Sequence, residues 1–229
     1  MVKCVYRISD GSYKKNRLPN ATKENCLANF LKEFEDVTLI ADNVSDETYK
    51  RLETTSPPWV KIVRTNSKGN GFSFNYALDY ALENFPNEYV YFVEDDYLHR
   101  KNSQKVLLEG LHRADYVSLY DHVDKYIPKQ NGGNPFIDTD GGELTRVYIT
   151  ESTHWKLTNS TTCTFATHAS KLAEDIDVWR QFTNHMHPND FHCFLNLREK
   201  GRSLITPLPS YSTHCDIEWV APLVDWSEL

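Results

Sequence analysis

Short apolar runs alternate with longer amphipathic stretches over roughly the first 120 residues. The runs are rich in aromatic and β-branched residues, which favour strands, so we expect strands at residues 2–8, 37–41, 59–64, 89–93 and 116–120. The stretches between them carry apolar residues at helical spacing and predict helices at residues 22–34, 45–52, 72–85 and 103–113. This alternation is typical of a doubly wound α/β sheet with right-handed crossovers.

The second half of the chain is less regular. Residues 130–142 are rich in Gly, Asn, Asp and Pro, which predicts a loop or a mobile flap with little apolar anchoring. Beyond it we expect short strands at residues 146–150, 155–158 and 204–208, and helices at residues 170–182 and 190–200. No linker separates the two halves, so we interpret residues 1–229 as a single domain.

Composition narrows the class of protein. The chain has 229 residues, of which 40% are hydrophobic and 25% charged, as in an ordinary globular protein. Its net charge of −7 offers no basic footprint for a nucleic acid, so we expect no nucleic-acid partner. No apolar run approaches the roughly 20 residues of a membrane span. The first residues, MVKCVYRISD, lack a signal-peptide core, and five scattered cysteines favour free thiols, so we expect a cytoplasmic protein.

Three consecutive carboxylates, Glu94, Asp95 and Asp96, follow the strand expected at residues 89–93. That strand shows no polar alternation, which indicates that both of its faces are buried. Because unpaired buried carboxylates are unfavourable, we expect the triplet at the open carboxyl end of the strand, where α/β sheets bind ligands. A hard divalent cation carrying a phosphorylated ligand would absorb the mutual repulsion of the three acids. A solvated acidic turn is the alternative.

Two other motifs follow predicted strands. One strand ends in IADNVSDET, in which Asp42 precedes residues that cap a helix. The next strand is followed by Asn66 and by a turn whose Gly69 and Gly71 permit a close backbone approach, before a helix that contains Asn75. The N-terminus of such a helix favours an anion, although a plain strand-to-helix turn is the commoner explanation of the glycines.

A third motif, Asn189-Asp190-Phe191-His192, opens the helix expected at residues 190–200, with Arg198 and Gly201 behind it. Asp190 follows Pro188, which fits a simple helix cap. A side chain at a helix start can equally stand at the rim of a cleft, so the two roles are compatible.

Taken together and in this order, the motifs resemble the GT-A fold glycosyltransferases of the family-2 type. The resemblance implies a Rossmann-like, mixed but mostly parallel sheet flanked by helices. It implies an inverting transfer of a sugar from a nucleotide-sugar donor to a glycan or glycolipid acceptor, assisted by Mn²⁺ or Mg²⁺. It divides the single domain into a nucleotide-sugar half, residues 1–120, and an acceptor half, residues 121–229. With no membrane span, a glycolipid acceptor would be reached by peripheral membrane contact.

The resemblance also assigns roles to single residues. Glu94-Asp95-Asp96 corresponds to the DxD motif, with Asp96 at the metal-binding position and Glu94 in place of the usual first Asp. A histidine near the C-terminus completes the metal site in some relatives of this fold, which implies His214 here, and neutral imidazole suits Mn²⁺. Two other histidines could compete for this role, His187 and His192.

On the donor side, Asp42 corresponds to the carboxylate that faces the nucleobase. A carboxylate can accept the ring N–H of uracil or thymine, so a UDP- or dTDP-sugar is implied. The remaining donor-binding positions implied are Arg7, Ser9, Asn43, Asn66, Gly71, Asn75, Glu94 and Asp95. The loop after the first strand carries three cations that either meet the diphosphate or form a solvated basic loop: Lys14, Lys15 and Arg17.

Asp190 corresponds to the catalytic base, although Asn189 and His192 replace two of the acids usual in that motif. Two rival functions remain open. A sugar nucleotidyltransferase would share the nucleotide-binding sheet and the carboxylate–metal site. A nucleotide- or carbohydrate-binding module that has lost catalysis would share the fold but would turn over no nucleotide sugar.

Overall fold

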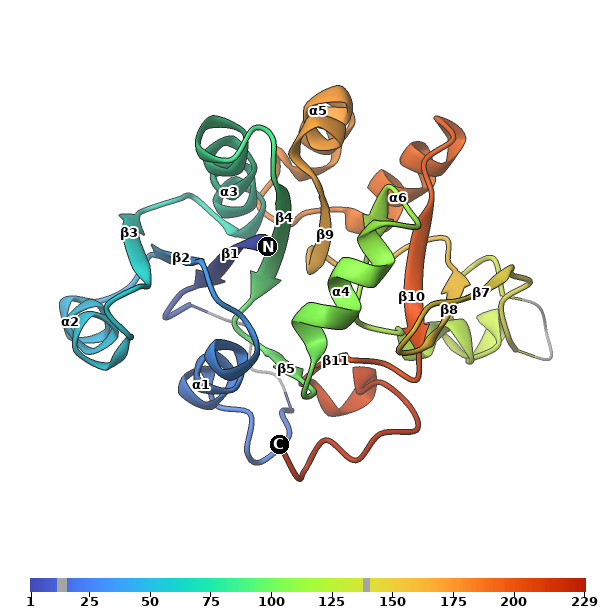
Figure 1. Ribbon diagram of the computed structural model, residues 1–229, viewed down its shortest axis with the longest axis horizontal. Coiled ribbons are helices and arrows are strands. Elements are labelled where there is room, and N and C mark those ends of the chain that lie inside the picture. The colour runs from blue at the N-terminus through green and yellow to red at the C-terminus, as the bar shows by residue number, and fades with distance from the viewer. Residues whose placement is uncertain (12–15, 138–140) are drawn as a thin grey trace.

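The computed structural model describes residues 1–11, 16–137 and 141–229 (Figure 1). Its centre is a nine-stranded sheet in the order β3-β2-β1-β4-β9-β6-β10-β8-β7. These strands are β1 Val2–Ile8, β2 Val37–Asp42, β3 Lys61–Thr65, β4 Tyr89–Glu94, β6 Tyr116–Val117, β7 Val147–Ile149, β8 His154–Leu157, β9 Phe165–His168 and β10 Leu204–Leu208. A separate two-stranded sheet pairs β5, Tyr97–His99, with β11, Ser212–His214.

Six α-helices and three 3₁₀ turns are described around these sheets. The helices are α1 Lys23–Glu33, α2 Asp46–Thr55, α3 Asn70–Asn84, α4 Ser103–Leu111, α5 Ala169–Thr183 and α6 Asp190–Glu199. The 3₁₀ turns are η1 Val123–Lys125, η2 Lys129–Asn131 and η3 Ile217–Trp219. Among the described residues, no helix combines the length and the apolar character that crossing a bilayer requires.

The sheet is mixed but mostly parallel, as the sequence predicts. Strands β3, β2, β1 and β4 are parallel neighbours, and β6 is parallel to β10. Strand β9 runs antiparallel to both β4 and β6, and β8 runs antiparallel to both β10 and β7. The described strands therefore share one direction except for β9 and β8. The α/β fold class is confirmed.

Each face of the sheet carries its own hydrophobic core. Helices α1 and α4 pack on one face, where the C-terminal Trp226 is also buried, and α3, α5 and α6 pack on the other (Figure 1). Strand β4 alternates between the cores: Tyr91 and Val93 face the first, and Val90 and Phe92 face the second. The missing polar alternation in this strand thus has the predicted cause, which is burial of both faces.

The sequence pattern misses three short strands and overextends one. Strand β9 has only four residues and gains its place by pairing with β4 and β6 on either side, which no local pattern encodes. The expected strand at residues 116–120 is wrong beyond Val117. From there the chain turns away, and Tyr120 forms an isolated bridge with Ser212. The pairing of β5 with β11 is likewise non-local.

The expectation that residues 130–142 lack anchoring is wrong for part of the segment. Asn134 and Ile137 are each only 1% exposed. The Asn134 backbone N–H donates to the Asp124 carbonyl at 3.1 Å, and the Asn159 side-chain amide donates to the Asn134 Oδ1 at 3.0 Å. Residues 138–140 of the predicted flap lie outside the described residues.

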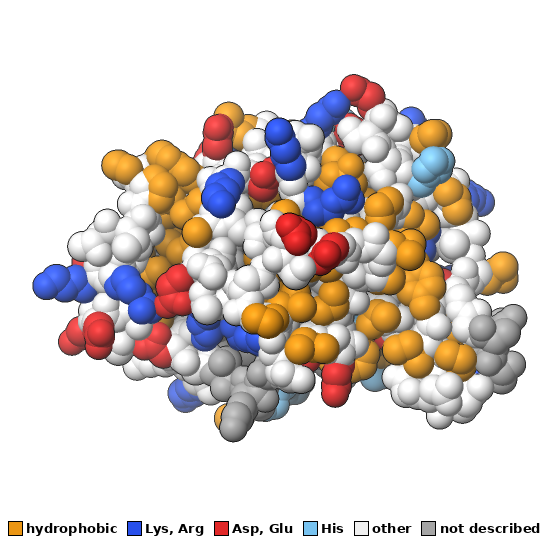
Figure 2. All heavy atoms as spheres, turned by 90° about the horizontal axis from the view of Figure 1, so that it is seen from below, with side chains coloured by type: hydrophobic (Ala, Val, Ile, Leu, Met, Phe, Trp, Pro, Cys, Tyr) orange, Lys and Arg blue, Asp and Glu red, His pale blue; other side chains and the backbone are white. Residues whose placement is uncertain are grey.

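The C-terminal tail runs below the sheets, close to α1 (Figure 1). Hydrophobic side chains gather near the middle of the face seen from below in Figure 2. Exposed apolar residues on this tail are Ile217, Leu223 and Leu229. Single exposed apolar side chains of this kind are common on folded proteins.

Candidate functional site

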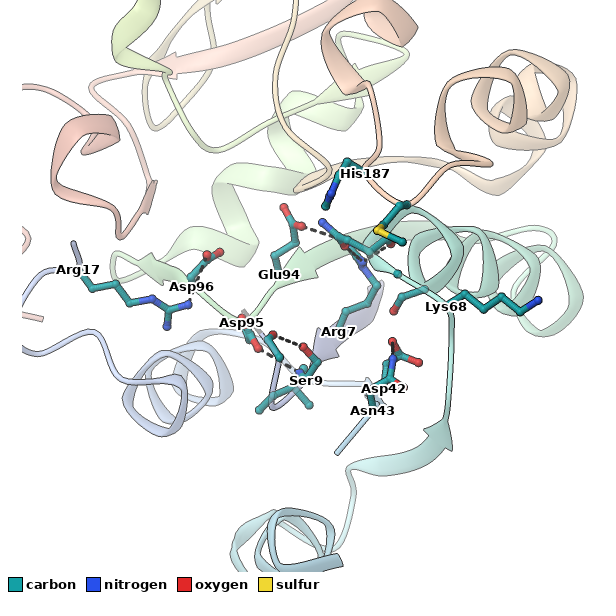
Figure 3. Close-up of a pocket in the computed structure, with 16 residues that line it drawn as sticks. Arg7, Ser9, Arg17, Asp42, Asn43, Lys68, Glu94, Asp95, Asp96 and His187 are labelled. Carbon is teal, nitrogen blue, oxygen red and sulfur yellow. Dashed lines mark hydrogen bonds and ion pairs between the residues drawn. The ribbon is translucent and has the colours of Figure 1, made fainter. Parts of the chain in front are cut away.

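A pocket of about 400 Å³ opens where the carboxyl ends of β1, β2 and β4 meet the start of α3 (Figure 3). This is the sheet edge that the sequence predicts for ligand binding. The predicted site residues that line it are Arg7, Ser9, Asp42, Asn43, Glu94, Asp95 and Asp96. Other polar or flexible residues also line it: Arg17, Lys68, Asn70, Ser73, Met186 and His187.

Arg7 forms the floor of the pocket. Its guanidinium lies 3.0 Å from the Glu94 carboxylate, donates to the Asn70 side-chain oxygen at 2.6 Å, and stands over the Phe74 ring. The side chain is 7% exposed, so this cation is held between β1, β4 and α3 before any ligand arrives. A fixed cation of this kind can stabilise an anionic ligand without first having to be ordered.

Asp95 is turned toward the first strand and α1. Its carboxylate accepts the Ser9 backbone N–H at 3.1 Å and pairs with the Lys23 ammonium at 3.1 Å. Burial raises the pKa of the Asp95 carboxyl, and the neighbouring Asp96 carboxylate raises it further, while Lys23 lowers it. The site therefore separates two adjacent acids by giving each a different cationic neighbour.

Asp96 lies on the other side, beside Arg17 (Figure 3). Its Oδ2 is 3.4 Å from the His214 Nε2 and 3.7 Å from the Arg17 guanidinium. The pairing of β5 with β11 sets this geometry, because Tyr97, next to Asp96, is opposite His214. Asp96 and His214, the metal ligands that the family resemblance implies, thus lie together although 118 positions separate them in the sequence.

Asp96 and His214 could both be ligands of one metal ion, provided that His214 adopts the tautomer with a free Nε2. A separation of 3.4 Å suits two ligands on one ion, since Mn²⁺ or Mg²⁺ ligands sit at about 2.0–2.2 Å. However, the His214 Nδ1 accepts the Asp216 backbone N–H at 3.2 Å, which leaves the proton on Nε2, so coordination through Nε2 requires the other tautomer. Over residues 1–11, 16–137 and 141–229 no group of three His, Cys, Asp or Glu side chains could hold a metal.

Asp42 forms the opposite wall of the pocket, at the end of β2. Its Oδ1 accepts the Thr65 hydroxyl and the Ser67 backbone N–H, each at 2.8 Å. Its Oδ2 accepts the Asn43 side-chain amide at 2.9 Å, and that amide also donates to the Ser67 carbonyl at 2.7 Å. The carboxylate is 4% exposed, so it is fixed in place and keeps acceptor capacity on Oδ2 for one more donor.

The structure does not bring Asn66, Gly71 and Asn75 to this pocket. Asn66 is exposed outside it, and the Asn75 Oδ1 accepts the Thr183 hydroxyl at 2.7 Å. A Cβ on Gly71 would stand 2.1 Å from the His185 carbonyl oxygen. Gly71 is therefore explained by close packing of α3 against the connection between α5 and α6.

That same connection supplies two lining residues that the sequence motifs miss as donor-site residues, Met186 and His187. They reach the pocket because the Gly71 backbone N–H donates to the Met186 carbonyl at 3.2 Å. The glycine itself was the available signal. It indicates a close backbone approach, but the approaching partner is protein.

Asp190 is the first residue of α6, and the helix cap is the preceding Asn189, whose Oδ1 accepts the His192 backbone N–H at 3.3 Å. The Asp190 Oδ1 accepts the Phe191 backbone N–H at 2.8 Å. Burial first and the Glu94 carboxylate second raise the pKa of Asp190, which reaches about 7. Asp190 does not line the pocket described above, yet it is close enough to the pocket residue Glu94 to be affected by its charge.

The chain matches no protein-family model and no curated protein sequence. It does share its fold with solved structures. A crystal structure of GalNAc-T7 with UDP, GalNAc and Mn²⁺ aligns with a TM-score of 0.61 at 10% identity, over 93% of this chain and 43% of its own. A CMP:2-keto-3-deoxy-manno-octonic acid synthetase complexed with CTP aligns with a TM-score of 0.51 at 12% identity, over 90% of this chain and 88% of its own.

A third structure, TarS from S. aureus, aligns with a TM-score of 0.49 at 20% identity, over 90% of this chain and 58% of its own. The other two likenesses show that the chain has the Rossmann-like GT-A fold. This chain spans less than half of the GalNAc-T7 chain. A glycosyltransferase and a nucleotidyltransferase share this fold, so the fold alone does not distinguish these two activities.

Proposed function

We propose that this protein is a metal-dependent, inverting glycosyltransferase that moves a sugar from a UDP- or dTDP-sugar to a hydroxyl of a glycan or glycolipid. The observation that carries the proposal is the arrangement of the pocket: Asp42 closes one side, Asp96 with His214 stands at the other, and Arg7 lies between them. Asp42 ends β2 and Asp96 follows β4, and these strands lie on either side of β1, two strand spacings or about 10 Å apart. A nucleoside diphosphate laid across this edge would meet a hydrogen-bond acceptor at its base and charged groups at its phosphates.

The donor end of the proposal rests on charge and hydrogen bonding. Asp42 would accept the ring N–H of a uracil or thymine. Arg7 and Arg17 would face the diphosphate, and Ser9 and Asn43 would lie along the nucleoside. Lys14 and Lys15 lie outside the described residues. GalNAc-T7 was crystallised with UDP and Mn²⁺, which is consistent with this donor class.

Asp96 and His214 would hold the divalent metal, which would neutralise charge on the departing diphosphate. Because the protein offers two ligands there, oxygens of the diphosphate would fill further positions, and metal and nucleotide should bind together better than either alone. The proposed tautomer change of His214 gives up the bond from the Asp216 backbone N–H and frees Nε2, which faces Asp96, for a metal.

Asp190 would act as the general base. It would accept the proton of the acceptor hydroxyl as the new bond to the anomeric carbon forms and the bond to the diphosphate breaks, which inverts the anomeric centre. A pKa of about 7 suits this task, because the group is then basic enough to take the proton and largely ionised at a slightly higher pH. Glu94 is paired with Arg7, and Asp95 with Lys23, so both stay on the donor side.

A nucleotidyltransferase is the second candidate, favoured by the alignment that covers 88% of the synthetase chain. The two functions release different products. We expect nucleoside diphosphate to be released from UDP- or dTDP-sugars with Mn²⁺, as transfer or as slow hydrolysis without acceptor. Release of pyrophosphate from CTP or UTP with a sugar, and of no nucleoside diphosphate from any donor in a panel, would overturn the proposal. A loss of catalysis would show as donor binding with neither product.

A further inference from the structure

Phe136 is an exposed aromatic ring on a firmly anchored turn. The ring is 63% exposed, although Asn134 and Ile137 beside it are each only 1% exposed. The Phe136 backbone N–H donates to the Asn134 Oδ1 at 3.1 Å, and the Ile137 backbone N–H donates to the Asn134 carbonyl at 3.0 Å. The turn therefore holds the ring in solvent in a fixed position, where a ligand could cover it.

The ring faces the start of α6. The Phe136 and Phe191 ring centroids are 6.2 Å apart and their planes are inclined at 33°. Phe191 is the residue after Asp190, and its backbone N–H donates to the Asp190 carboxylate at 2.8 Å. Phe191 also contacts the His192 ring, at 5.1 Å between centroids. The pair of aromatic rings therefore lies at the first turn of α6, the turn that begins with Asp190.

We propose that Phe136 and Phe191 form an acceptor platform on which the apolar face of a pyranose ring stacks, so that one of its hydroxyls meets Asp190. The inference deepens the proposed function and rests on it for the role of Asp190. A pyranose has one face of C–H groups and a rim of hydroxyls, which matches two rings at a helix start that also carries Asn189, Asp190 and His192.

The surroundings favour a sugar over a lipid chain or a protein segment. Those occupants need a broad apolar surface, whereas α6 begins beside this ring pair with Asn189, Asp190 and His192. The connection between α5 and α6 also carries His187, which lies three residues before Asp190 and lines the pocket of about 400 Å³ (Figure 3). The sugar could belong to a free glycan or to the head of a glycolipid, because the stacking chemistry is the same.

The test uses methyl glycosides as probes, a panel of methyl glucosides, galactosides and N-acetylhexosaminides, with the full chain. Saturation-transfer NMR should show contact through the ring C–H protons in the parent and in Phe136→Tyr. Phe136→Ala should weaken glycoside binding about 3- to 10-fold, the loss expected for one ring contact. UDP binding should be unchanged. Trp59→Ala, which removes an aromatic that is 47% exposed elsewhere, is the matched control and should change neither.

Retention of the same glycoside contacts in Phe136→Ala, or no ring-proton contact in the parent with any probe, would overturn the platform. So would binding of plain phosphatidylcholine vesicles that is lost in Phe136→Ala while glycosides bind equally to both. These readouts need no turnover. Failure of the platform is therefore distinguishable from failure of the proposed function, which would show as absent nucleoside diphosphate release although glycosides still bind.

Discussion

Two clusters of charged side chains in this protein have the same kinds of residues and different consequences. The pocket cluster consists of Arg7, Lys23, Glu94, Asp95 and Asp96 and faces a cavity of about 400 Å³. The loop cluster consists of Asp121, Asp124, Lys125, Glu143 and Lys156, which ion pairs join across the second half of the chain. Both contain acids and bases held close together, but only the first is open to a ligand.

In the loop cluster the charges satisfy one another. The Lys156 ammonium is 2.8 Å from the Asp121 carboxylate, and both side chains are 3% exposed. The Lys125 ammonium is 3.1 Å from the Asp124 carboxylate and donates to the Ser160 hydroxyl at 2.9 Å. Burial lowers the pKa of Lys125, and Asp124 opposes this. The comparison teaches that a run of buried charges is a candidate site only where the fold leaves a face open to solvent.

The largest expected effect lies beside the pocket cluster. Asp190→Asn keeps the size of the side chain and removes its basicity, so transfer should fall by about 10²–10⁴-fold while donor binding stays near the parent value. Steady-state rates and donor titration on the same preparation measure both. Parent-like turnover would show that another group, such as His192 or Glu151, takes the proton, and would remove Asp190 from the mechanism.

Removing a charge from the loop cluster should lower the stability of the fold. Lys156→Met leaves Asp121 buried without its cation, which should lower the free energy of unfolding by about 3–5 kcal/mol. Lys171→Met is the control, because its pair with Glu174 is partly exposed and should be worth about 0–1 kcal/mol. Denaturant unfolding measures both. Equal stability of the two variants would mean that the loop cluster does not hold this half of the chain.

Asp42 combines features of both clusters, because it is held by hydrogen bonds within the protein and also lines the pocket. In Asp42→Asn the side-chain oxygen can keep the bonds from Thr65 and Ser67, but the new amide would meet the Asn43 amide and could no longer accept from a base. UDP binding should weaken by about 1–3 kcal/mol, with little change for GDP. Asp46→Asn, at an exposed carboxylate four residues on, should alter neither. A parent protein that binds UDP and GDP equally would contradict the assignment of Asp42 to the nucleobase.

A further effect is a pH dependence of stability. The pKa of Asp190 is about 7 in the folded protein, against roughly 3.9 in an unfolded chain. The folded state therefore holds this proton more tightly, and the stability that it contributes is present below about pH 4 and is lost as the pH rises through 7. Unfolding of the parent should become easier over this range relative to Asp190→Asn. Parallel stability curves for the two proteins would show that the pKa is not raised.

The sequence predicts those features of the fold that depend on a few neighbouring residues. Strands β1, β2 and β4 and the acidic triplet were predictable because burial of both faces and the abrupt change to carboxylates are visible within a few residues. The position of Asp96 beside His214 depends on β11 pairing with β5, and the order of the sheet depends on β9 entering between β4 and β6. Such pairings join distant segments, so periodicity does not encode them.

The glycine-rich turn shows a second limit. Gly69, Asn70 and Ser73 do line the pocket, but Gly71 is glycine because the His185 carbonyl approaches it. A glycine signals a close approach without naming the partner. In the same way, the Gly- and Asn-rich composition of residues 130–142 predicts a loop but conceals that Asn134 is a buried hydrogen-bonding anchor.

The central claim is a metal-assisted nucleotide site at Asp96, and calorimetric titration with UDP tests it most directly. With Mn²⁺ present, the parent should bind UDP clearly more tightly than with EDTA, and Mn²⁺ alone should bind weakly because the protein supplies two ligands. Asp96→Ala should keep the parent fold by circular dichroism and lose the Mn²⁺-dependent part of UDP binding. UDP affinity that is the same with and without Mn²⁺, or a metal-dependent affinity unchanged in Asp96→Ala, would contradict the account.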